Sequence, residues 1–111
     1  MMDMEENNAQ PISISVKKHI VIFGKHDYIV RNVQTLLERA DYSSEGFINL
    51  PEILDYIKMN PLDAIIIGGG VDPHDRIKVQ ELIKSDFPHV KMVEHYGGPA
   101  TIIPELKQAL I

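Results

Sequence analysis

Glycine and polar residues that could bind a ligand follow directly after three apolar segments of the sequence. They are Gly24, Lys25, His26 and Asp27, then Gly68, Gly69, Gly70 and Asp72, and finally His95. Glycine-rich loops expose backbone N–H groups, and with a lysine beside them they could bind an anion or a nucleotide phosphate. The glycines fit neither the G-x-G-x-x-G pattern nor the P-loop, and Asp72 would repel an anion there. An anion site is therefore one open hypothesis for these residues.

A metal site and an acid–base catalytic site are two other chemistries that these loops could support. Imidazole and carboxylate groups are typical ligands of Zn²⁺ or Fe²⁺. The candidate ligands are His26, His74, His95 and Asp72 or Asp75. None of these residues are paired at the i, i+4 spacing of two ligands on one helix, and no serine near the loops forms a nucleophile motif. We therefore expect no catalytic residue, no metal, no cofactor and no enzyme activity.

A purely structural interpretation of the same residues is the simplest. Glycines allow tight turns, acidic residues cap helices, and histidines such as His26 are solvated polar side chains. By the same reasoning His19, before an apolar run, and His89, after Pro88, are structural.

Four apolar segments of the sequence have the character of β-strands. Residues 19–24 (HIVIFG) and 63–68 (DAIIIG) are continuous apolar runs, as expected of strands covered on both faces. Residues 90–94 form a third run, and residues 42–48 form a weaker, more polar one that suits the edge of a sheet.

Four helices are predicted between and after these strands. Residues 27–40 carry Val30, Val33, Leu37 and Ala40 at helical spacing, with Asp27 as the expected N-cap. Asn49-Leu50-Pro51-Glu52 resembles a capping box and starts a helix to about residue 59. Asp72 caps the next helix, which ends before Pro88 and is expected to bury its apolar side chains at 79, 82, 83 and 87; residues 101–110 form the last helix.

This alternation of strands and helices predicts an α/β fold. Apolar strands joined by helices form a parallel sheet covered on both faces, so we expect a three-layer α/β/α sandwich with a four-stranded parallel sheet. In such sheets ligands bind beyond the carboxyl ends of the strands, where the strand order reverses. The loops after the first, third and fourth strands should meet there.

Composition limits the class of protein further. The chain has 111 residues, a formal net charge of −5, 44% hydrophobic residues and no cysteine. We expect residues 1–16 to be a flexible leader and residues 17–111 to form one domain. The sequence lacks the basic stripe that is typical of nucleic-acid-binding proteins. Its longest apolar run, residues 64–67, is too short to span a membrane. The absence of cysteine fits a cytoplasmic protein.

The order of the elements resembles the receiver domains of bacterial response regulators. The stretch LLERADY (36–42) at the end of the first helix and DAIIIG (63–68) followed by Pro73 carry the resemblance, which runs over about residues 18–92. It implies a flavodoxin-like sheet of strand order 2-1-3-4.

The same resemblance implies that the chemistry of the family is missing. An acidic pair that binds Mg²⁺ and a phosphoacceptor Asp follow the first and third strands of receivers. Gly24, Lys25 and Gly68 occupy those positions here, and Glu94 or Tyr96 stands where the family has a hydroxyl residue. The resemblance thus implies a degenerate receiver that cannot be phosphorylated on Asp, because phosphoryl transfer needs those carboxylates.

Too few residues follow Glu94 for the fifth strand of the family, so we expect the fourth strand to lie at an edge of the sheet. Apolar edge strands are usually paired, covered or charged. We therefore expect a non-catalytic signalling or protein-interaction module with a protein partner or a homodimer. The alternative is binding of a small anion, a nucleotide or a metal at the loops described above.

Overall fold

A computed structural model describes residues 17–111 of the chain. The expected leader, residues 1–16, lies outside the described residues. The elements alternate as strand and helix from β1 to α4, with one short 3₁₀ helix before α4.

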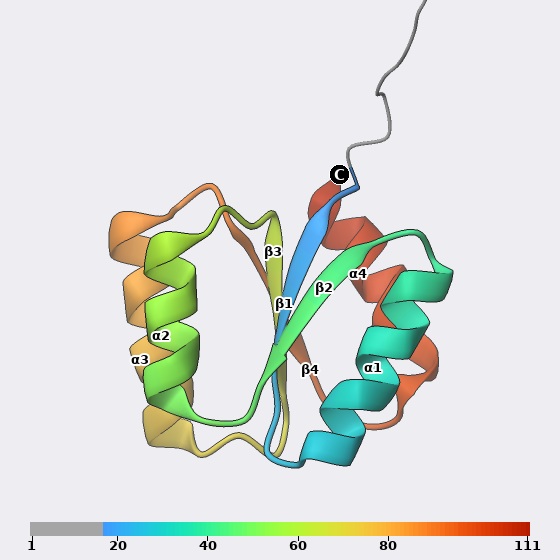
Figure 1. Ribbon diagram of the computed structural model, residues 1–111, viewed down its shortest axis with the longest axis horizontal. Coiled ribbons are helices and arrows are strands. Elements are labelled where there is room, and N and C mark those ends of the chain that lie inside the picture. The colour runs from blue at the N-terminus through green and yellow to red at the C-terminus, as the bar shows by residue number, and fades with distance from the viewer. Residues whose placement is uncertain (1–16) are drawn as a thin grey trace, which may run out of the picture.

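The centre of the molecule is a four-stranded parallel sheet of order β2-β1-β3-β4 (Figure 1). Its strands are β1 (His19–Phe23), β2 (Ser43–Phe47), β3 (Ala64–Gly68) and β4 (Lys91–His95). β1 and β3 are the inner strands, and their residues 20–23 and 64–67 lie side by side in register. This confirms the predicted fold class and strand order, and it places the polar β2 at an edge.

Two helices cover each face of the sheet (Figure 1). They are α1 (Asp27–Arg39), α2 (Leu50–Met59), α3 (Pro73–Asp86) and α4 (Ile102–Leu110), which follows the 3₁₀ helix η2 (Pro99–Thr101). α2 and α3 lie on one face, and α1 and α4 lie on the other. β1 and β3 are therefore covered on both sides, which explains their unbroken apolar sequences.

Alternation along the strands divides the core into two layers. Val21, Phe23 and Ile65 point toward α2 and α3, where they meet Ile53 and Val79. Their chain neighbours point to the other face and pack under α1 and α4; they are Ile20, Ile22, Ala64 and Ile66, in contact with Val30, Leu37, Ile102 and Leu106.

The helix caps agree with the sequence at two of the three predicted positions. The Asn49 side chain accepts a hydrogen bond from the Glu52 amide at 3.0 Å, and the Asp72 side chain accepts one from the His74 amide at 2.8 Å. The prediction for Asp27 was wrong. His26 is the N-cap residue of α1 and makes no side-chain capping bond, while Asp27 lies in the first turn and pairs with Arg31 at 2.7 Å. A carboxylate in the first turn still interacts favourably with the helix dipole.

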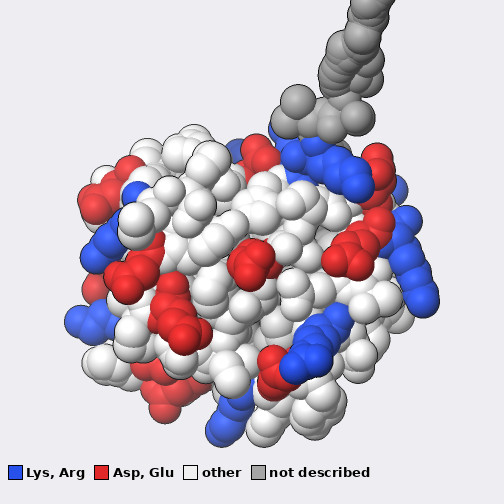
Figure 2. All heavy atoms as spheres, viewed as in Figure 1, with Lys and Arg blue, Asp and Glu red and all other residues white. Residues whose placement is uncertain are grey.

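Smaller differences concern residues at the ends of elements. Ala40, Leu82 and Phe87 were expected in the core but are half-buried, and β4 ends at His95 rather than Glu94. Basic and acidic side chains are mixed on the face shown in Figure 2. Among residues 17–111, no helix is long and apolar enough to cross a membrane.

Candidate functional site

The carboxyl ends of β1, β3 and β4 lie together at one end of the sheet. We call the residues just beyond these strand ends the rim. The rim contains a cavity of about 370 Å³. Its lining residues are Gly24, Lys25, His26, Ile29, Gly68, Gly69, Gly70, His95, Tyr96 and Gly97. The structure thus brings together all but two of the residues predicted to bind a ligand.

The two predicted residues outside this cavity are Asp27 and Asp72. Asp27 is held by Arg31, and Asp72 caps α3 through the His74 amide. Asp72 also lines an adjoining hollow of about 270 Å³, together with Lys25 and Asp75. Both carboxylates therefore help to start helices, as the structural interpretation of the sequence expects.

Lys25, His26 and Tyr96 are exposed side chains of the cavity. His26 stacks on Tyr28, with 5.7 Å between the ring centroids. Among the described residues, Lys25 has no ion-pair partner. The cavity therefore presents one lysine above backbone supplied mainly by glycines.

His95 differs from the solvated histidine that the sequence suggested. Only 6% of the residue is exposed, and both ring nitrogens are hydrogen-bonded. Nδ1 lies 2.8 Å from Oε1 of Glu105, and Nε2 lies 2.7 Å from the carbonyl oxygen of Gly98. Hydrogen bonds from His95 and Thr101 lower the pKa of Glu105, while partial burial acts in the opposite direction. His95 thus joins β4 to α4 rather than pointing freely into the cavity.

Arg76 forms a second polar cluster at the rim that the sequence did not indicate. Its guanidinium donates to Oε1 of Glu94 at 2.9 Å and to the carbonyl oxygen of Gly68 at 2.7 Å. It also lies over the ring of Tyr96, 5.3 Å from the centroid. Gln80 donates a further hydrogen bond to Glu94. This cluster fixes the ends of β3 and β4 to α3.

The glycines of the rim do not all have the same role. A Cβ on Gly69 would lie 2.7 Å from Cδ1 of Tyr96, so this glycine allows the tyrosine ring to pack closely. A Cβ on Gly68 would meet nothing nearer than the Phe23 carbonyl oxygen at 3.6 Å, which is an ordinary contact. A Cβ could therefore be accommodated at residue 68, whereas at residue 69 the Tyr96 ring would have to shift.

The candidate metal ligands do not come together. Within residues 17–111, no three His, Asp or Glu side chains are grouped closely enough to hold a metal ion. His74 is exposed and lies beside Asp75 at the start of α3.

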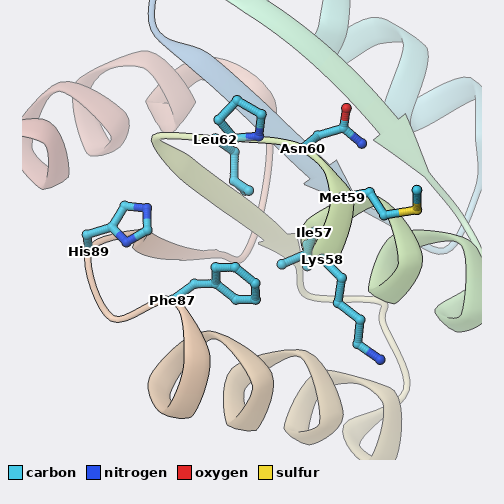
Figure 3. A pocket seen from close by; sticks show the side chains of 8 residues that line it. Ile57, Lys58, Met59, Asn60, Leu62, Phe87 and His89 are labelled. Carbon is cyan, nitrogen blue, oxygen red and sulfur yellow. The ribbon is translucent and has the colours of Figure 1, made fainter.

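The opposite end of the sheet, where the strands begin, has its own polar cluster and hollow. His19 Nδ1 lies 2.7 Å from the Ser43 hydroxyl, and its Nε2 lies 2.7 Å from the Tyr56 hydroxyl, so the ring joins β1, β2 and α2. Burial, and to a smaller extent Glu45, raises the pKa of Tyr56. A hollow of about 330 Å³ lies near this end, between the ends of α2 and α3 (Figure 3). It is lined by Met59, Phe87 and His89 among others, and it contains none of the predicted ligand-binding residues.

Comparison with known proteins identifies the architecture. No family model matches the sequence, and no curated protein sequence matches it. The structure matches the signal receiver domain of an HD domain-containing protein from Pseudomonas fluorescens Pf-5, with a TM-score of 0.65 and 16% sequence identity over 86% of this chain and 77% of that one. The fold is that of a receiver domain. A response regulator from Thermotoga maritima matches with a TM-score of 0.61 and 14% identity, over 86% of this chain and 82% of the other.

The residues that the sequence analysis compared with receivers lie at the ends of the strands. Gly24 and Lys25 follow β1 directly, and Gly68 is the last residue of β3. These are the positions at which the resemblance places the acidic pair and the phosphoacceptor. Glu94 and His95 close β4.

Proposed function

We propose that the chain is a non-catalytic, cytoplasmic signalling or protein-interaction module that is not phosphorylated on Asp. The observation that carries this proposal is the rim of the receiver fold, where Gly24, Lys25 and Gly68 follow β1 and end β3. A divalent cation needs oxygen ligands, and a phosphoryl group needs a nucleophile and charge neutralisation. Glycine supplies no side-chain ligand, and the lysine would repel Mg²⁺.

Treatment with acetyl phosphate and Mg²⁺, read out by intact-protein mass spectrometry, tests the loss of phosphoryl transfer. We expect no phosphorylated species from the natural sequence. The double variant Lys25→Asp, Gly68→Asp introduces two carboxylates, and a Cβ at residue 68 makes only ordinary contacts. We expect Mg²⁺-dependent labelling of this variant only, and labelling of the natural chain would refute the proposal.

The partner surface that we propose is the outer edge of β4, with a second copy of the chain as the partner. Among residues 17–111, β4 pairs with β3 alone, and α4 packs on its face against Val93. The Lys91 amide bonds inward to the Asp63 carbonyl, so strand alternation turns the backbone of Met92 and Glu94 outward. Antiparallel pairing of two such edges would use the outward amides and carbonyls of Met92 and Glu94 in both copies.

Light scattering over a range of concentrations measures this association. We expect a mass near twice the 12.6 kDa of one chain at high concentration. Met92→Pro removes an outward amide of this edge and should weaken the dimer. Ser44→Pro removes an outward amide of the other edge strand, β2, and should have no effect on the mass. A monomer at every concentration, or equal weakening by both variants, would refute the dimer.

Binding of a small anion at the rim remains the second candidate, favoured by the cavity that unites Lys25 with the glycine loops. Native mass spectrometry of the purified chain with inorganic phosphate or a nucleotide tests it. A bound species lost in Lys25→Ala would support this alternative, and an empty rim with a stable dimer would favour the interaction module.

A further inference from the structure

The ring of His95 is enclosed between two hydrogen-bond acceptors. The Gly98 carbonyl oxygen, 2.7 Å from Nε2, can only accept. An ionised Glu105 carboxylate, 2.8 Å from Nδ1, can also only accept. A neutral imidazole has a single N–H and cannot satisfy both partners.

The two hydrogen bonds therefore require one proton more than a neutral imidazole and an ionised carboxylate carry between them. That proton lies either on the ring, giving an imidazolium, or on the Glu105 carboxyl group. The pKa of Glu105 is lowered chiefly by its hydrogen bond with His95, and Thr101 donates to its second oxygen at 3.0 Å. The proton is therefore shared within the His95–Glu105 pair.

These hydrogen bonds add to the apolar contacts between β4 and α4. They link the last residue of β4 with the turn before η2 and with the first turn of α4. α4 has only nine residues; it buries Ile102 and Leu106 fully and packs Ile103, Ala109 and Leu110 partly against the same core. A second hollow of about 210 Å³, lined by His95, Val33, Pro99 and Ile102 among others, lies between α1 and α4. The packing of α4 is therefore incomplete beside the histidine.

We propose that His95 and Glu105 form a proton-dependent clamp on α4, and that protonation of His95 is an input signal to this module. This inference rests on the proposed function, in which Asp phosphorylation is not the input. Imidazole is the side chain whose charge changes between about pH 5 and 8. Loss of the proton leaves one acceptor facing another, so the turn and α4 loosen as pH rises.

The charged and titratable groups around the ring act in both directions. Glu105 of α4 favours the imidazolium. Lys25 and His26, from the loop between β1 and α1, line the same cavity and oppose a further positive charge when protonated. Tyr96 also lines that cavity, and Arg76 of α3 lies over its ring. Because opposing charges surround it, the clamp should respond to occupation of the rim as well as to pH.

NMR of the labelled chain between about pH 5 and 8 tests the clamp. The ring signals of His95 report its protonation, and amide hydrogen exchange corrected for intrinsic rates reports the protection of α4, with β1 and β3 as internal reference. Losing a charge-assisted hydrogen bond corresponds to about a tenfold fall in protection. We expect that fall in α4, following the titration of His95, while β1 and β3 remain unchanged.

Variants distinguish the clamp from a general effect of pH. Glu105→Gln can donate to Nδ1 of a neutral ring, so we expect α4 to be protected at every pH. Glu105→Ala should lose the protection of α4 at every pH. His89→Asn removes an exposed histidine at the opposite end of the sheet and should leave the response unchanged.

Three results would overturn the clamp. They are an α4 protection that stays constant while His95 titrates, a His95 that does not titrate in this range, and the same pH response in Glu105→Gln. Each leaves the proposed function intact, whereas phosphorylation of the natural chain would refute that function without altering the proton count at His95.

Discussion

Replacing Arg76 with methionine removes the group that joins α3 to the ends of β3 and β4. The guanidinium makes two charge-assisted hydrogen bonds, to Glu94 at 2.9 Å and to the Gly68 carbonyl at 2.7 Å, and lies over Tyr96. Methionine keeps much of the aliphatic packing of the arginine stem. The difference between the two proteins therefore measures the polar contacts.

The expected loss follows from the burial of the two charged groups. A hydrogen bond to a charged group contributes about 1.5–3 kcal/mol, and an exposed cation–π contact adds about 0.5–1 kcal/mol. The Arg76 side chain is 12% exposed, but that of Glu94 is 35% exposed and keeps Gln80 as a partner. Because Glu94 can return to water, we expect the free energy of unfolding to fall by about 2–3 kcal/mol rather than by the full sum.

Urea unfolding followed by far-UV circular dichroism measures this loss. The matched control is Arg31→Met, which breaks an ion pair with Asp27 whose side chains are 74% and 57% exposed. That pair should contribute no more than about 0.5 kcal/mol. Equal losses in the two variants, or a loss below about 0.5 kcal/mol for Arg76→Met, would show that the partly buried cluster does not stabilise the rim.

Three further predictions concern backbone geometry and pH. A Cβ on Gly46 would collide with a γ-carbon of Val30, so Gly46→Ala should lower the free energy of unfolding by about 1–3 kcal/mol in urea titrations. Gly97 has a φ of +93°, and a Cβ there would meet no atom within 4 Å, so Gly97→Ala should cost about 1–2 kcal/mol from the backbone alone; no change in its melting temperature would contradict this. The pKa of Glu105 is lowered in the folded state, so its contribution to stability is present above its ordinary value of 4.5 and lost as pH falls through the lower folded value. Melting temperatures between about pH 6 and 3 should therefore fall less steeply in Glu105→Gln, which lacks that linkage to His95.

The sequence was sufficient for most of the fold because its signals are local. Each continuous apolar run became a strand of the sheet, and Asn49 and Asp72 cap the helices that follow them. The strand order came from the resemblance to receivers. The N-cap of α1 was predicted at Asp27 instead of His26 because both residues precede the first apolar residue of the helix. In the structure His26 is the last residue with an extended backbone, and Asp27 is already helical.

The site was harder to predict because its contacts are distant in sequence. The carboxyl ends of parallel strands all lie at the same end of the sheet, so the grouping of the rim residues was predictable. The bond between Arg76 and Glu94 spans 18 residues, and no local pattern indicates it. His95 had a signal that was overlooked. It follows the buried Val93 by two residues, so strand alternation points it to the same covered face, where a histidine must find partners.

The partners of four carboxylates near the rim support the proposal that this chain is not phosphorylated on Asp. A carboxylate that binds Mg²⁺ must keep its oxygens available to the metal. Asp27 is paired with Arg31, Asp72 caps α3, Glu94 accepts from Arg76, and Glu105 faces His95. Each of these four groups has a structural role, and a metal would have to break a helix cap or an ion pair to use it. These four carboxylates are therefore poor candidates for the Mg²⁺ ligands that phosphoryl transfer needs, which supports the proposal that the chain is not phosphorylated on Asp.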